Sequence, residues 1–162
     1  MGIIKAKTSE PIQVTAANAR VYSDYTFSFE LQTDLPAGGS LEVEFPSGQY
    51  RLLLGIPLHT TCSVPCIRTD YTVRFAYSAG LAKNQTHTVT VKNIMNPDYS
   101  GGTGNFKLKT IKGSNTLDLN LIFGTIGIGD GVKQLTSVLL TSTDLKAGNV
   151  SNYSIQFKTI SA

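Results

Sequence analysis

Apolar and polar residues alternate with a period of two along much of this chain. Between residues 25 and 32, the odd positions are Tyr, Phe or Leu and the even positions are Thr, Ser, Glu or Gln. Successive side chains of a β-strand point to opposite faces, so this pattern predicts a strand with one buried face. A second alternating stretch, 41–45, follows a turn predicted at 35–39 and ends at Pro46.

Short strands separated by turn residues account for the rest of the chain. Further strands are expected at 12–16, 50–56, 71–77, 86–92, 105–111, 117–123, 133–141 and 153–160. No stretch has a sustained helical period, and only 15% of the residues are charged, against about 25% in typical soluble domains. Many short strands without crossover helices predict an all-β fold of two packed antiparallel sheets, a β-sandwich. The alternation predicts a core made of Phe27, Phe29, Leu41, Val43, Phe45, Val89, Val91, Phe106, Leu108, Leu119, Ile126, Ile155 and Phe157.

The net charge of +3 is spread along the chain. The densest basic group, Lys107, Lys109 and Lys112, has the alternation of a solvated strand face, whereas nucleic-acid binders gather basic residues and aromatics on one surface. No segment approaches the ~18 consecutive apolar residues of a membrane span. The sequence therefore predicts no nucleic-acid partner and no membrane insertion. Residues 1–9 lack the apolar run of a signal peptide, so the signal of a secreted protein was removed or lay upstream.

The C-terminal part of the chain resembles an N-terminal part at a constant spacing of 128 residues. Thr15, Ala19, Ser23, Tyr25 and Phe29 have identical counterparts at Thr143, Ala147, Ser151, Tyr153 and Phe157. One interpretation is two unrelated amphipathic strands, because strand alternation alone produces some matches. The other is a complete repeat, 1–135, followed by terminal strands, 136–162, that resemble the opening of a following repeat. In that case Tyr153, Ile155 and Phe157 form an apolar face without a partner in the first repeat, and we expect this face to mediate head-to-tail self-association.

The two cysteines, Cys62 and Cys66, are separated by three residues. A zinc site needs two further ligands; of the two histidines, His59 is close in sequence but His87 has no metal-ligand spacing. A redox pair favours two intervening residues rather than three. We therefore predict a short local disulfide formed in an oxidising compartment, with two free buried thiols of a cytosolic protein as the alternative.

Three N-glycosylation sequons are present, beginning at Asn84, Asn149 and Asn152. In a chain this rich in Ser and Thr, some sequons arise by chance. Asn84 follows a turn cluster and is the best candidate, whereas Asn149 and Asn152 are too close for easy double occupancy. We expect some glycosylation if the source is eukaryotic.

Residue patterns typical of active sites are missing from the sequence. There is no G-x-S-x-G nucleophile elbow, and the acidic residues are dispersed. The Gly-rich stretch 124–129 lacks the G-x-G-x-x-G order and a following helix, so it predicts a kinked strand. The loops around Asp98 and Asp130 fall short of the ~6 oxygen ligands of a calcium site. We therefore expect no enzymatic activity, no cofactor and no metal.

Taken in order, the motifs of this chain resemble a known repeat. They occupy 25–29, 35–39, 41–46, the cysteine pair, 89–97, 102–106, 123–128 and 147–157. This order of motifs is similar to tandem repeats of very large secreted or cell-surface proteins of ciliates and other protists, and the similarity covers residues 12–160. The resemblance implies an immunoglobulin-like antiparallel β-sandwich, no catalytic residues, and a terminal segment that opens the next copy.

Two functions from different classes remain open at this point. The first is an extracellular structural repeat or subunit that assembles end to end into a filament, stalk or surface coat. The second is a carbohydrate-binding or adhesin module of a cell-surface protein, in which exposed aromatics contact glycans. The candidate aromatics are Tyr22, Tyr50, Tyr71 and Tyr99, all near predicted turns, although the absence of Trp weakens this interpretation.

Overall fold

The computed structural model describes residues 1–50, 61–69, 71–130, 136–142 and 153–158. The chain divides into two compact units, Met1–Gly131 and Val132–Ala162. The boundary expected from the sequence lay four residues further along, within 131–135, which are outside the described residues.

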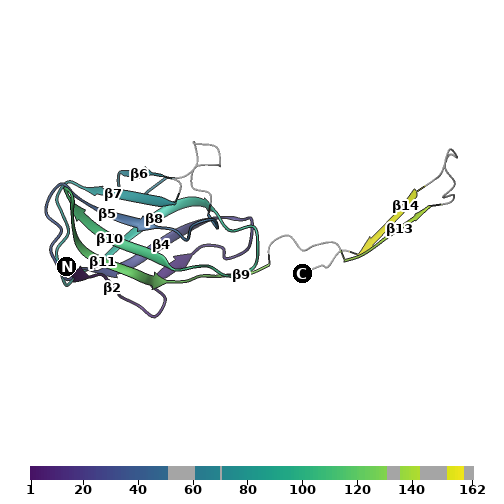
Figure 1. The fold of residues 1–162 in the computed structure, drawn as a ribbon, viewed down its shortest axis with the longest axis horizontal. Coiled ribbons are helices and arrows are strands. Elements are labelled where there is room, and N and C mark those ends of the chain that lie inside the picture. Colours follow the sequence, from purple (N-terminus) through teal and green to yellow (C-terminus); the bar gives the residue numbers. More distant parts are fainter. Residues whose placement is uncertain (51–60, 70, 131–135, 143–152, 159–162) are drawn as a thin grey trace. The chain divides into compact units, whose positions relative to one another are not determined.

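All regular elements of the described chain are strands (Figure 1). They are β1 (Gly2–Ile3), β2 (Lys5–Ala6), β3 (Ile12–Val14), β4 (Tyr22–Glu30), β5 (Gly39–Glu44), β6 (Cys66–Arg68), β7 (Thr72–Tyr77), β8 (Thr86–Met95), β9 (Gly101–Gly102), β10 (Phe106–Lys112), β11 (Asn115–Gly124), β12 (Gly127–Ile128), β13 (Thr136–Ser142) and β14 (Tyr153–Lys158). The long predicted strands are confirmed to within a few residues, whereas most of the strand predicted at 50–56 lies outside the described residues. The two-residue strands were not predicted, because two residues are too short to show a period.

The first unit contains two larger sheets. One has six strands in the order β1-β11-β10-β5-β7-β6, and the other is built on β4. One edge of β4 pairs with β8, and its other edge pairs with β2 and then β3. Every pairing in these sheets is antiparallel except β1 with β11. The fold is therefore all-β, with an arrangement compatible with a β-sandwich.

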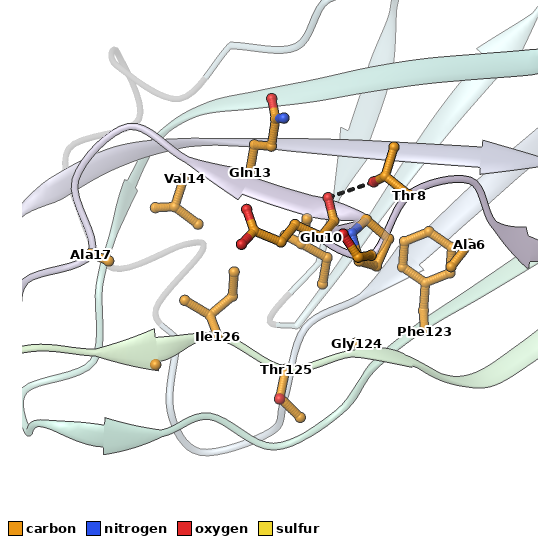
Figure 2. Close-up of a pocket in the computed structure, with 14 residues that line it drawn as sticks. Ala6, Thr8, Glu10, Gln13, Val14, Ala17, Phe123, Gly124, Thr125 and Ile126 are labelled. Carbon is orange, nitrogen blue, oxygen red and sulfur yellow. Dashed lines mark hydrogen bonds between the residues drawn. The ribbon is translucent and has the colours of Figure 1, made fainter.

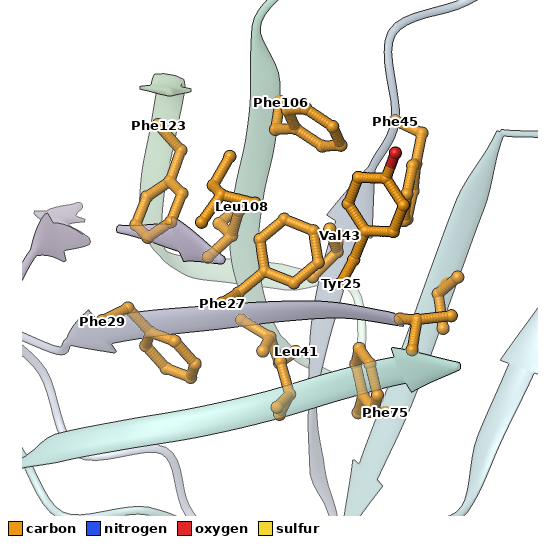
Figure 3. Packing of buried hydrophobic residues seen from close by; sticks show 14 of the residues in the cluster. Tyr25, Phe27, Phe29, Leu41, Val43, Phe45, Phe75, Phe106, Leu108 and Phe123 are labelled. Atoms are coloured by element: carbon orange, nitrogen blue, oxygen red, sulfur yellow. The ribbon is translucent and has the colours of Figure 1, made fainter. Parts of the chain in front are cut away.

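Aromatic side chains from both sheets form the core of this unit (Figure 3). Tyr25 and Phe27 of β4 contact Phe45, which follows β5, and Phe106 of β10, with ring centroids 5.2–6.1 Å apart among the four rings. All four are fully buried. The alternation in β4 thus has the predicted consequence: its apolar face packs against the opposite sheet, and Thr26 lies on the other face.

Two segments pass from one sheet to the other along the sides of the unit. Near the N-terminus, β1 pairs with β11 and β2 pairs with β4, while Ile4 between them is fully buried. On the other side, Cys62 forms a bridge with Val91 of β8, and β6 pairs with β7. Each of these two segments therefore connects an edge of one sheet to an edge of the other through backbone pairing.

The facing of β11 differs from the prediction. Leu119 was expected in the core, but it is only partly buried, and Asp118 is fully buried instead. The carboxylate Oδ2 of Asp118 accepts hydrogen bonds from the backbone amides of Gln32 and Thr33, at 3.0 and 2.9 Å. A bulge between residues 120 and 124 then changes the facing again, so that Phe123 is buried. The simple alternation of the sequence misses both features.

The N-terminus and the last strand of the first unit, β12, lie at opposite ends of this unit. Figure 1 shows the N-terminus at one end of the unit and β9, which pairs with β12, at the other. Beyond β12, Gly129 exchanges backbone hydrogen bonds with the 17–19 loop. Among the described residues, no helix is long and apolar enough to cross a membrane.

Candidate functional site

The second unit is a two-stranded antiparallel hairpin. Strand β13 pairs with β14 so that Leu140 lies opposite Ile155, Thr141 opposite Ser154, and Ser142 opposite Tyr153. No further strand pairs with either of them in the described part of the chain. A single two-stranded hairpin is at best marginally stable in water, because it has no second layer to bury its apolar face.

This hairpin reproduces the pairing of β3 with β4 in the first unit. There, Ile12 lies opposite Phe27, Gln13 opposite Thr26, and Val14 opposite Tyr25. Each of these six residues is 128 positions before a residue of the hairpin, and the three pairs correspond one to one. Two unrelated amphipathic strands have no reason to share both a sequence spacing and a pairing register. The shared register therefore favours the interpretation of 136–158 as a second copy of 8–30.

The two hairpins differ in what covers them. Tyr25 and Phe27 are fully buried in the first unit, whereas their counterparts Tyr153 and Ile155 are 67% and 64% exposed. On the opposite face of the hairpin, Leu139 is also exposed. The prediction that Ile155 belongs to the core is wrong, because periodicity identifies an apolar face but not whether a partner covers it. The side chain of Phe157, the third predicted association residue, lies outside the described residues.

A buried polar network completes the environment of Tyr25. Its hydroxyl donates to Oδ1 of Asn96, and the amide of Asn96 donates to the carbonyls of Ala16 and Asn18, both at 2.7 Å. The hydroxyl of Tyr25 also lies 3.3 Å from that of Tyr50. Burial raises the pKa of Tyr25 well above its usual range and raises the pKa of Tyr50 to about 12. Its counterpart Tyr153, in contrast, is 67% exposed among the described residues.

The predicted disulfide between Cys62 and Cys66 is confirmed, with the two Cα atoms 6.2 Å apart. The loop that it closes connects the two sheets. On one side, the backbone amide of Ser63 donates to the carbonyl of Thr90 in β8, and on the other the amide of Ala76 in β7 donates to the carbonyl of Pro65. The disulfide therefore fixes one of the crossings between the sheets.

Asn84 lies at an exposed turn before β8. Its φ of 58° is in the left-handed region, which Asn tolerates better than most residues, and Thr86 of the sequon is also exposed. The position is accessible to solvent, and glycosylation of Asn84 stays a prediction. Asn149 and Asn152 lie outside the described residues.

An open groove of about 920 Å³ lies between β3 and the end of β11 (Figure 2). Ile12, Val14 and Ile126 contribute apolar side chains, and Glu10 is its charged residue. Phe123, which also lines the groove, is only 3% exposed, so its ring face is not available for stacking on a sugar. Among the predicted glycan-contacting aromatics, Tyr22, Tyr71 and Tyr99 are 39–50% exposed, but Tyr50 is buried and cannot take this role.

The described residues contain no group of three or more His, Cys, Asp or Glu side chains placed to hold a metal ion. His87 contacts the carbonyl of Ala82 through Nε2, at 2.7 Å. Asn96, two residues before Asp98, is buried and hydrogen-bonded to Tyr25 and to backbone carbonyls. His59 lies outside the described residues.

Sequence reasoning missed two buried polar residues that shape this unit, Asn96 and Asp118. For Asn96 the sequence contained a weak indication of a special role, because this polar residue directly follows the apolar strand that ends at Met95 and directly precedes Pro97. Asp118 lies between two Leu residues in an alternating strand and gave no signal, since the same pattern is typical of a polar outward face.

Comparisons with known proteins give structural likeness but no family. No family model matches the chain, and no curated protein matches it. The chain is similar to the crystal structure of BslA, described as a bacterial hydrophobin, with a TM-score of 0.44 and 17% sequence identity over 74% of this chain and 94% of that one. At this level of likeness, we infer neither a family nor a function from it.

Proposed function

We propose that this chain is an extracellular structural protein made of immunoglobulin-like β-sandwich repeats, which assembles end to end through its C-terminal hairpin. The observation that carries the proposal is the hairpin itself. It repeats the register of β3 and β4 at a constant spacing, yet leaves Tyr153 and Ile155 exposed. An exposed apolar face next to an unpaired strand edge favours association with another chain or repeat.

Three further features support this proposal. The disulfide between Cys62 and Cys66 fits an oxidising, extracellular compartment. The chain enters and leaves the first unit at opposite ends, which suits a linear array of repeats (Figure 1). The accessible sequon at Asn84 fits a surface glycoprotein. A contact between different ends of the same molecule propagates, because it does not close on itself as a two-fold contact does.

Light scattering after size exclusion tests the assembly. We expect the mass of the full chain to rise with concentration, and a chain ending at residue 131 to stay monomeric with its fold intact. Ile155→Asp should also abolish association, since it places a charge on the exposed apolar face. Leu139→Asp is the matched control on the opposite face and should associate like the unchanged chain. A full chain that is monomeric at every concentration, or a truncated chain that associates equally, would contradict the proposal.

The competing proposal, a carbohydrate-binding or adhesin module, depends on the partly exposed Tyr22, Tyr71 and Tyr99. A glycan array separates the two proposals. Binding that is lost when these tyrosines are replaced, in a chain that stays monomeric, would favour the carbohydrate-binding module.

A further inference from the structure

We infer that the free edge of β14 is an acceptor site for one particular kind of strand, a second copy of β8. The hairpin and a second copy of residues 31–131 would then form another two-sheet unit like the first. This inference rests on the proposed structural role, because it names the partner that covers the hairpin.

The pairing of β4 in the first unit identifies which edge is involved. One edge of β4 is taken by β2 and β3, and the other pairs with β8 along its whole length, from Tyr22 to Glu30. In the hairpin, β13 takes the edge of β14 that corresponds to β3. The edge of β14 that no described strand pairs with therefore corresponds to the one that β8 covers in β4. An extended strand added there gains main-chain hydrogen bonds, and its alternate side chains reach both faces.

The register of this pairing follows from the first unit. Tyr25 lies opposite Val91, Thr26 opposite Thr90, and Phe27 opposite Val89. The equivalent positions in the hairpin place Tyr153 opposite a second Val91, Ser154 opposite a second Thr90, and Ile155 opposite a second Val89.

The two faces of the inferred pair are chemically matched. The apolar face brings Tyr153 and Ile155 against valines. The polar face pairs Ser154 with a threonine, as in the first unit, where the hydroxyls of Thr26 and Thr90 are 2.9 Å apart. A register shifted by one residue would place apolar side chains opposite threonines, so the pattern selects one register.

A complete second copy of the first unit does not offer this strand. One edge of its β8 is already paired with its own β4, and the other is bonded to residues 61–63, where the amide of Lys92 donates to the carbonyl of Thr61 at 2.8 Å. The partner is therefore a portion equivalent to 31–131 whose β8 is not paired with its own β4. In end-to-end assembly of separate chains, the hairpin of one chain would take the place of β3 and β4 in the next chain. Such a portion also supplies a second Asn96 and Tyr50 for the hydroxyl of Tyr153.

An extended chain tests the inference, with residues 1–158 followed directly by a second copy of 31–131. We expect two cooperative unfolding units and a second protease-resistant core. Ile155→Asp in this chain should remove the second unit and leave the unfolding midpoint of the first unchanged. Leu139→Asp, on the opposite face, should retain both units.

Cross-linking tests the register. Ser154→Cys combined with Thr90→Cys in the added copy should form a disulfide, because these positions correspond to Thr26 and Thr90, which lie directly opposite each other. Ser154→Cys combined with Thr88→Cys in the added copy, two residues out of register, should not.

Three results would overturn the inference: an added segment that stays unfolded beside an intact first unit, efficient cross-linking of the shifted pair, or a two-fold dimer that joins hairpin to hairpin. If one of these occurs while the natural chain still assembles end to end, the proposed function stands and only its named partner is wrong. If the added segment folds but the natural chain remains monomeric, the strand pairing is correct and end-to-end assembly of separate chains is wrong.

Discussion

Replacing Phe27 by Ala tests the packing of the first unit, because this side chain lies where the two sheets meet. It is fully buried, with its ring centroid 5.5 Å from that of Phe106, 5.9 Å from Phe45 and 6.5 Å from Phe123 (Figure 3). Truncation of a buried Phe to Ala costs about 3–5 kcal/mol, and the loss of several ring contacts favours the upper part of that range. With an m-value of about 2 kcal/mol per M, a loss of about 4 kcal/mol lowers the urea midpoint by about 2 M.

The assay is urea unfolding of the full chain followed by circular dichroism. Ile155→Ala is the matched control at the equivalent position of the hairpin; since that side chain is 64% exposed, it should change the stability of the first unit by less than about 0.5 kcal/mol. Phe27→Leu retains part of the buried volume and gives a smaller loss, so the series stays measurable if Phe27→Ala does not fold. A cost below about 1 kcal/mol for Phe27→Ala, or equal effects at both positions, would refute the packing inferred for the first unit.

Three further predictions concern the disulfide, Asp118 and alkaline stability. Reduction of the disulfide between Cys62 and Cys66 should lower the unfolding free energy by only about 2 kcal/mol, because a short closed loop restricts the unfolded chain less than a long one. Urea melts with and without reductant measure this loss, and no change would count against a role of the disulfide in joining the sheets. Asp118→Ala should cost about 3 kcal/mol in the same assay, because two backbone amides lose their acceptor, and a loss below about 1 kcal/mol would contradict that role. Burial raises the pKa of both Tyr50 and Tyr77 from 10.0 to about 12, so the folded state holds these protons more tightly than the unfolded state. The stability they contribute is therefore complete below about pH 10 and is lost as the pH rises toward 12, and melts across this range that show no decline would contradict it.

The sequence was sufficient for the parts of the fold that depend on local periodicity. In β4 and β5, the alternating apolar residues predicted both the strands and the buried faces, because one face of each strand packs on the core. The disulfide was predictable for a different reason: two cysteines separated by three residues have few other roles in a β-rich chain.

Other features depend on contacts between distant parts of the chain and were not predictable from periodicity. The facing of Asp118 and Leu119 depends on where residues 32 and 33 place two backbone amides, which no local pattern encodes. The exposure of Ile155 depends on the absence of a covering strand among the described residues, since its own sequence context is nearly that of the buried Phe27. The same similarity led to the hypothesis of a repeat, and the shared register of the two hairpins is consistent with that hypothesis.

The central claim is that β14 is the uncovered counterpart of β4, and hydrogen exchange measured on both strands in one dilute sample tests it most directly. At a concentration where the chain is monomeric, we expect the amides of β4 to exchange only through global unfolding, because β4 is paired along both edges and buried. The amides of β14 should exchange near the rate of an open hairpin and gain protection as the concentration rises. If β14 were as well protected as β4 in the dilute monomer, the hairpin would already be covered within its own chain, and the central claim would be contradicted.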